Sequence, residues 1–148
     1  MKKVLTLIML AILSTSLFAG EQDGDFVQTK DDVYFLKNVR LGVSSFLVGI
    51  MENGEKIKFA KEDVLVYKMS GERFEKMPVV KDNVCLEETC FMKVIAYKCG
   101  LKVYKHEYYD NSGKLTSRHY VFKKDQFVVK FDRENTQNLT AFFAGELD

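Results

Sequence analysis

The sequence predicts an α+β fold in which a mainly antiparallel β-sheet, built as a meander of hairpins, is covered by one or two helices. Three observations lead to this prediction. Strand-like runs rich in Val, Ile, Tyr and Phe recur along the chain, turns that contain glycine separate them, and one stretch near residue 90 has a helix-like order of charges. We expect about seven to eight strands, arranged as one curled sheet or as two layers.

The start of the chain is typical of a bacterial secretory signal peptide. Lys2 and Lys3 precede a mostly apolar run over residues 4–18, and Ala19 then offers a small residue at a cleavage point. The apolar run is too short and too interrupted to favour a membrane span. We therefore expect cleavage near Ala19, a secreted or periplasmic protein, and no integral membrane segment in the mature chain.

The composition of the remaining chain narrows the choice of partners. The whole sequence has 22 Lys and Arg against 21 Asp and Glu, so without Lys2 and Lys3 the charges nearly balance. Such a balance gives no argument for nucleic acid as a partner. We expect residues 1–19 to be the signal, residues 20–32 a flexible acidic leader with a possible short strand at Phe26 and Val27, and residues 33–148 a single globular domain.

Hairpins are expected in the first half of the domain. Strand-like runs cover residues 33–36, 44–51, 56–59, 64–67 and 73–77. Asn53-Gly54 favours a two-residue turn, which would pair Ile50 with Ile57. That register gives one buried face made of Phe46, Val48, Ile50, Ile57 and Phe59. Ser70-Gly71 is expected to join the last two runs, and Pro78 to end the final one.

The stretch from residue 101 to residue 131 predicts three consecutive strands. Between the first two lies Asp-Asn-Ser-Gly-Lys, residues 110–114, which suits a three-residue loop with the glycine in the left-handed region. That loop pairs His106 with Arg118 and Lys105 with His119. The two histidines then lie on opposite faces of the hairpin, so a two-histidine metal site is disfavoured and we expect no metal.

One face of this hairpin carries an aromatic strip with titratable groups. Its members are Tyr104, His106, Tyr108, Arg118 and Tyr120, with Phe122 next in line. Such a strip can stack on sugars, bases or a peptide, and we take it as the candidate binding site. The alternative is a structural role, because tyrosine is common in half-buried strands and cross-strand aromatic pairs stabilise sheets.

Two segments are predicted to be helical. In residues 84–100, Glu87 and Glu88 precede an apolar set, Lys98 follows it, and Gly100 could cap the end. The same stretch also has strand-forming residues, but we choose the helix. Residues 132–143 suit a short C-terminal helix capped by Asp132 or Asn135.

Three cysteines remain after the signal. Cys85 and Cys90 are the preferred disulfide candidates, Cys85 with Cys99 is the alternative, and one thiol is left over in either case. A buried, inert thiol is the more frequent situation, and the spacing gives no metal motif.

Three functions remain open. The first is an exported non-catalytic module that binds a protein, peptide or glycan through a sheet face or edge. The second is a small periplasmic hydrolase or thiol-dependent enzyme, with the candidate groups His106, His119, Cys99 and Asp110. The third is a structural protein of the envelope, with a possible homodimer formed through a strand edge. No cofactor is predicted, because no phosphate-binding or dinucleotide-binding glycine motif occurs in the sequence.

Overall fold

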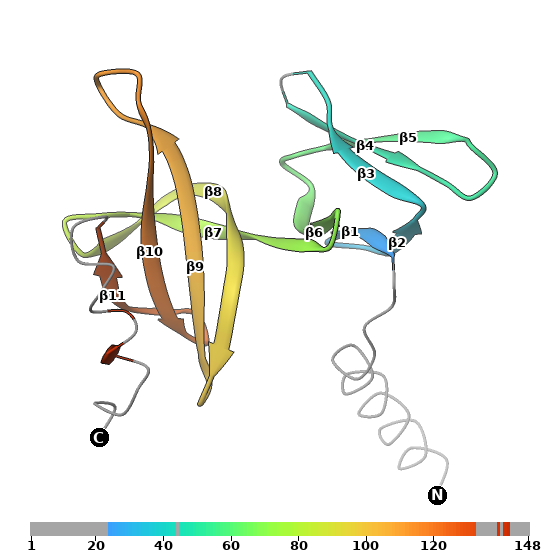
Figure 1. The fold of residues 1–148 in the computed structure, drawn as a ribbon. Helices are drawn as coiled ribbons and strands as arrows, with labels where there is room; N and C mark the ends of the chain where they lie inside the picture. Colours follow the sequence, from blue (N-terminus) through green and yellow to red (C-terminus); the bar gives the residue numbers. More distant parts are fainter. Residues whose placement is uncertain (1–23, 44, 133–138, 140, 143–148) are drawn as a thin grey trace, which may run out of the picture.

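The fold is an antiparallel β-structure of two sheets. The computed structural model describes residues 24–43, 45–132, 139 and 141–142, and the expected signal peptide lies outside them. Figure 1 shows the arrangement of the eleven strands in the described part of the chain. They are β1 (Asp25–Thr29), β2 (Val33–Leu36), β3 (Asn38–Leu41), β4 (Phe46–Ile50), β5 (Lys56–Ala60), β6 (Val64–Met69), β7 (Glu72–Lys81), β8 (Val84–Lys98), β9 (Leu101–Tyr109), β10 (Leu115–Lys123) and β11 (Gln126–Phe131).

Eight strands form one continuous sheet in the order β11-β10-β9-β8-β7-β6-β1-β2, and β3, β4 and β5 form a separate small sheet. All neighbouring strands in both sheets are antiparallel. From β6 to β11 each strand pairs with the next one along the chain, as a meander of hairpins does. The prediction of a mainly antiparallel sheet is therefore confirmed.

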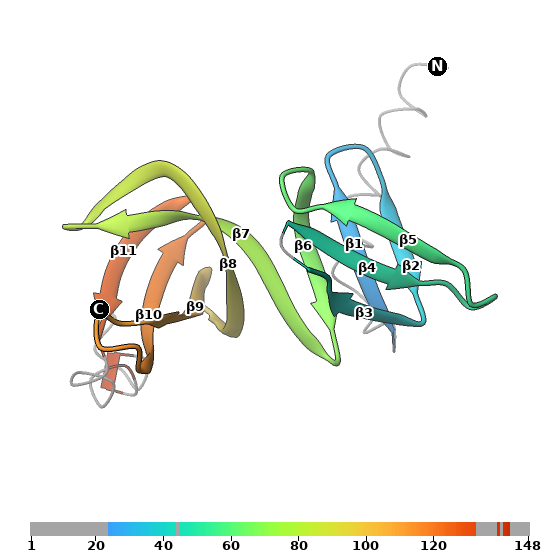
Figure 2. The same ribbon diagram turned by 90° about the horizontal axis from the view of Figure 1, so that it is seen from above.

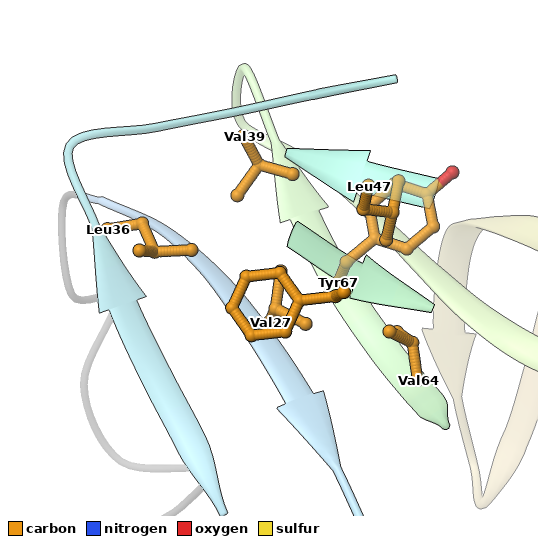
Figure 3. Close-up of a cluster of buried hydrophobic side chains, with 7 residues drawn as sticks. Val27, Leu36, Val39, Leu47, Val64 and Tyr67 are labelled. Atoms are coloured by element: carbon orange, nitrogen blue, oxygen red, sulfur yellow. The ribbon is translucent and has the colours of Figure 1, made fainter. Parts of the chain in front are cut away.

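The small sheet covers one face of the large sheet at its β1–β2 end. Figure 3 shows the cluster between them, in which Val39 and Leu47 of the small sheet face Val27, Leu36 and Tyr67 of the large one. Val27 and Leu47 are fully buried. Burial of these aliphatic side chains is the main stabilising contribution to this end of the molecule.

At the other end, β7 to β11 curl around a second core, as both views of the fold show (Figures 1 and 2). Met77 and Val80 of β7 share a buried cluster with Tyr120 and Phe122 of β10, although two strands separate β7 from β10 in the sheet. Strands that are not neighbours in the sheet can contact each other in this way only if the sheet bends. The curled arrangement was one of the two that the sequence predicted.

The outer face of the curled strands has a third cluster. Val103 and Val121 lie there beside Phe131, and Leu139 and Phe142 pack against them. The rings of Phe131 and Phe142 are 5.6 Å apart. Leu139 and Phe142 thus pack on the outer face of β9, β10 and β11.

The predicted helix over residues 84–100 is wrong, because residues 84–98 form the strand β8 and a turn follows it. Its two ends are tight turns, one at Asp82-Asn83 and one at Cys99-Gly100, and all four turn residues have positive φ. Gly100 therefore closes a two-residue hairpin turn rather than capping a helix. Val94, Ile95 and Tyr97 favour the strand, and pairing on both sides outweighs the helix-like order of charges.

The predicted C-terminal helix is not confirmed as a packing layer. Leu139, Ala141 and Phe142 are helical, and most of residues 132–143 lie outside the described part of the chain. The described fold is consequently all-β apart from these positions, not α+β.

Strand β1 occupies residues that the sequence analysis assigned to a flexible leader. Phe26 and Val27 do form a strand, and it lies inside the large sheet between β2 and β6. Asp25, which is buried, accepts hydrogen bonds from the backbone N–H groups of Val39 at 2.8 Å and Ser70 at 2.9 Å. The ordered fold therefore begins at least eight residues before Val33.

The Asn53-Gly54 hairpin forms, but the predicted register is wrong by one residue. Ile50 pairs with Lys56 instead of Ile57, because the loop holds three residues between Met51 and Glu55. Leu47, Gly49 and Phe59 are the buried positions, while Phe46 is exposed. Gly49 suits its site because an added Cβ would lie 2.6 Å from a methyl group of Leu36.

Candidate binding surface on the β9–β10 hairpin

The turn of the β9–β10 hairpin has the predicted geometry. The N–H of Asp110 donates to the carbonyl of Lys114 at 3.0 Å, and that of Gly113 donates to the carbonyl of Asp110 at 2.9 Å. Gly113 has φ +76°, which glycine adopts without penalty. The predicted pairing of His106 with Arg118 and of Lys105 with His119 is confirmed.

The carboxylate of Asp110 is committed to this turn. It accepts hydrogen bonds from the N–H of Ser112 at 2.8 Å and from the N–H of Lys114 at 3.0 Å, as well as one from the Ser112 hydroxyl. These bonds lower the pKa of Asp110, with the Ser112 side chain as the largest cause. Asp110, one of the candidate groups of the enzyme hypothesis, therefore has a structural role in the turn.

The pairing within the hairpin extends beyond its pairing with either neighbouring strand. The last pair between β8 and β9 is Lys93 with Lys105, and the last pair between β10 and β11 is His119 with Phe131. Four further pairs, from His106–Arg118 to Tyr109–Leu115, continue to the turn. We call residues 106–118 the arm; it rises above the curled sheet in Figure 1.

The structure divides the predicted aromatic strip into a buried part and an accessible part. Tyr104 and Tyr120 are each only 2% exposed and belong to the core of the curled strands. They are unavailable for a ligand, so their assignment as binding residues is wrong. The curl of the sheet, which places Met77 and Val80 over this face, is the reason.

Three members of the strip remain partly accessible on the arm: His106, Tyr108 and Arg118. The guanidinium carbon of Arg118 lies 4.7 Å from the centre of the Tyr108 ring, a cation–π distance. The His106 ring lies 5.7 Å from that of Tyr108 and 6.4 Å from that of Tyr120. We call these three side chains the shelf.

The charges of the shelf residues are fixed near neutral pH, with His106 neutral and Arg118 positively charged. Burial and the charge of Arg118 lower the pKa of His106, so the imidazole is neutral. Burial alone would lower the pKa of Arg118, but interactions with Tyr108, Tyr120 and Asp132 raise it overall. Arg118 Nε also donates to Asp132 Oδ1 at 2.8 Å, which fixes the guanidinium plane.

The opposite face of the arm carries two apolar side chains that are exposed to solvent. Tyr109 and Leu115 lie directly across from each other next to the turn. Tyr109 is 73% exposed and Leu115 is 52% exposed. Cross-strand pairs of this kind normally stabilise a sheet by burial, which this pair does not achieve.

His119 lies on the other face from His106, as predicted, and the structure does not bring the two together. Its Nδ1 is buried without a hydrogen-bond partner in the described part of the chain. Burial and then the charge of Lys105 lower the pKa of His119. Among the described residues there is no group of three or more His, Cys, Asp or Glu that could hold a metal ion.

The predicted disulfide between Cys85 and Cys90 is wrong. All three cysteines are free thiols, with Cys85 and Cys99 exposed. The pair Cys85 and Cys90 lies on one extended strand, where five residues span roughly 16 Å, far beyond the reach of a disulfide. The alternative pair Cys85 and Cys99 is separated by nearly the whole of β8.

Cys90 is a half-buried thiol at the core of the curled strands. It packs against the cluster that holds Tyr120, and burial, with Glu88 as a second cause, raises the pKa of its thiol to about 11. A nucleophilic cysteine needs a lowered pKa and a cationic neighbour. Cys90 is therefore poorly suited to catalysis, while Cys99, the thiol of the enzyme hypothesis, is exposed in the turn between β8 and β9.

The buried carboxylate of Glu75 is a site that sequence reasoning missed. It accepts hydrogen bonds from the Tyr104 hydroxyl at 2.6 Å, from Arg73 Nε at 2.8 Å and from Lys102 Nζ at 3.1 Å. Burial alone would raise the pKa of Glu75, but these partners lower it. Nothing in the local sequence separates Glu75 from the other charged residues of β7, because two of its three partners, Tyr104 and Lys102, come from β9.

The chain matches no protein-family model, and it shows no match to curated proteins or to solved structures. Within the described residues, no helix is long and apolar enough to cross a membrane. The geometry of the arm and of the surfaces around it is therefore the basis for a functional proposal.

Proposed function

We propose that the protein is an exported, non-catalytic binding module of the bacterial cell envelope, and that the arm captures an extended segment of a partner protein. The observation that carries this proposal is the Tyr109–Leu115 pair. It places two large apolar side chains in water at the end of a hairpin whose last four pairs have no partner strand on either side among the described residues. The cost of exposing them is offset if a partner covers them.

The backbone of the arm favours an extended peptide as the occupant. Beyond Lys105 and His119 the described residues provide no paired strand on the outer edges of β9 and β10. An added strand can form main-chain hydrogen bonds there, as in β-augmentation. Side chains of such a peptide would alternate between the shelf on one face and the Tyr109–Leu115 pair on the other.

The state of the candidate catalytic groups supports a non-catalytic role. Of the four candidate groups, Asp110 holds the turn and His106 packs between two tyrosine rings. Each of these groups has a structural explanation. Export rests on the basic start and apolar run of residues 1–19.

A peptide selection tests the proposal. A random peptide library is displayed on phage and selected against the protein beginning at Gly20, and enriched peptides are measured by fluorescence anisotropy. Tyr109→Ala combined with Leu115→Ala should weaken binding by about tenfold or more, the size expected for anchor residues. The matched control is Tyr97→Ala. Tyr97 is also an exposed tyrosine, at 69%, and it lies near the C-terminal end of β8, away from the arm.

Two outcomes would overturn the proposal. One is a selection that enriches no peptide for the wild-type protein. The other is a peptide whose affinity falls with Tyr97→Ala but not with the double substitution on the arm.

A further inference from the structure

A hollow separate from the shelf is lined by residues of the four neighbouring strands β6, β7, β8 and β9. Its volume is about 390 Å³, near the lower end of small-molecule sites. It opens on the face of the sheet that carries Lys105 and Glu107, so the shelf lies on the other side.

Aromatic rings form the floor of the hollow. The rings of Tyr67 and Phe74 are stacked, 4.7 Å apart with an angle of 10° between their planes. The Phe91 ring meets Tyr67 edge-on at 5.0 Å and 70°. Tyr67 is buried, whereas Phe74 and Phe91 are partly exposed, so their surfaces are the ones a ligand can reach.

Two ion pairs form the rim. Lys105 Nζ donates to Glu107 Oε1 at 2.6 Å along β9, and Lys93 of β8 pairs with Glu72 of β7. The rim thus carries two positive and two negative charges, all from residues that line the hollow. It has no net charge that would attract either an anion or a cation.

We propose that this hollow binds a neutral sugar ring of an oligosaccharide. The apolar C–H face of a pyranose can stack on Phe74 and Phe91, as apolar surfaces do on aromatic rings. Each sugar hydroxyl is both a donor and an acceptor. One hydroxyl can therefore donate to Glu107 while it accepts from Lys105, and another can do the same at Glu72 and Lys93.

The charge state of the rim fits this ligand. Hydrogen bonding to Lys105, followed by the charge of Lys105, lowers the pKa of Glu107, so the carboxylate is an acceptor at neutral pH. Burial raises the pKa of Tyr67 to about 12, so the tyrosine beneath the floor stays neutral. Charged hydrogen-bond partners for hydroxyls around an apolar floor match the two surfaces of a sugar ring.

Titration of the ¹⁵N-labelled protein with neutral oligosaccharides tests the site. The probes are the tetramers of cellulose, starch and chitin, with sialyllactose and a tetrapeptide as charged and non-sugar comparisons. We expect amide shifts at Phe74, Phe91 and Lys105 with at least one neutral sugar. Phe91→Leu and Lys105→Met should each weaken that binding by about fivefold to tenfold.

The control variant is Phe35→Leu, because Phe35 is a partly exposed phenylalanine of β2 that does not line the hollow. Lys105→Met keeps the inference testable if Phe91→Leu unfolds, since Lys105 is a rim residue outside the buried clusters. Shifts confined to other regions, binding of the charged sugar or the tetrapeptide alone, or no shift up to the solubility limit would overturn the inference. The substitutions on the arm should leave sugar binding unchanged, so failure here and failure of the peptide site can be distinguished.

Discussion

The hydroxyl of Tyr104 donates a hydrogen bond of 2.6 Å to the buried carboxylate of Glu75. The two residues come from β9 and β7, which are separated in the sheet by β8. Lys102 and Arg73 pair with the same carboxylate. These contacts therefore join β7 to β9 across β8 inside the curled half, and β9 is the strand that continues into the arm.

Replacing Glu75 with glutamine should destabilise the protein at pH 7. The amide keeps the size of the side chain but leaves Lys102 and Arg73 without a negative partner and turns one acceptor into a donor. We expect a loss of about 1–3 kcal/mol in the free energy of unfolding, measured with urea. Glu55→Gln, in an exposed loop, is the matched control and should change little.

The free energies of unfolding of the wild type and of Glu75→Gln should become similar in acid. The pKa of Glu75 is lower in the folded state than its ordinary value of 4.5. Its ionised form therefore contributes stability above that value, and the contribution is lost as the pH falls through the lower, folded-state pKa. The difference between wild type and Glu75→Gln should shrink below pH 4.5; a difference that stays constant there would contradict this assignment.

The two histidines should make the fold less stable in mild acid. Both have pKa values below the ordinary 6.5, through burial and then through Arg118 for His106 and Lys105 for His119. Protonation thus favours the unfolded chain, so stability is full above pH 6.5 and falls as the pH drops below it. The melting temperature should decline in this way between pH 7.5 and pH 5. In the double variant His106→Gln/His119→Gln the decline should be smaller. Equal slopes for wild type and double variant would speak against it.

At two glycines, alanine and asparagine substitutions should rank in opposite order in their cost to stability. Gly113 has φ +76° and open space around its Cβ position, so alanine should cost roughly 1–2 kcal/mol and asparagine, which tolerates this region, less. Gly49 faces Leu36 and Phe59, so alanine should cost about 1–3 kcal/mol through overpacking and asparagine more. Chemical denaturation of the four variants checks the order, and asparagine ranking the same way at both sites would refute the distinction.

Alkylation should separate the three thiols. Cys85 and Cys99 are exposed and should react in the native protein. Cys90 should react only on unfolding, because it is half-buried and its pKa is raised to about 11. The mass should be the same with and without reductant before alkylation. A Cys90 that reacts faster than the exposed thiols would instead revive the thiol-enzyme hypothesis.

Local turn chemistry made the register of the β9–β10 hairpin predictable. Asp110 and Gly113 favour one loop, and the pairing of His106 with Arg118 follows from it. Asn53-Gly54 did not determine the register of the β4–β5 hairpin, because the dipeptide suits both a two-residue turn and the three-residue loop that forms. In β4 both faces have apolar residues and Gly49 has no side chain, so the pattern did not identify the buried face.

Long-range contacts explain the failures. In β8, acidic residues near the start and a glycine after the end imitate a helix, while the pairing partners that make it a strand lie in β7 and β9. The burial of Tyr104 and Tyr120 depends on the curl that brings Met77 to this face. The same holds for the aromatic floor, which joins residues of β6, β7 and β8.

Hydrogen exchange on the arm tests the central proposal most directly. Backbone amides of residues 106–109 and 115–118 are measured with and without a peptide from the selection. The account predicts that the peptide slows exchange in one of these two segments, because an added strand forms main-chain hydrogen bonds there. Slower exchange in other strands, with the arm unchanged, would contradict capture by the arm.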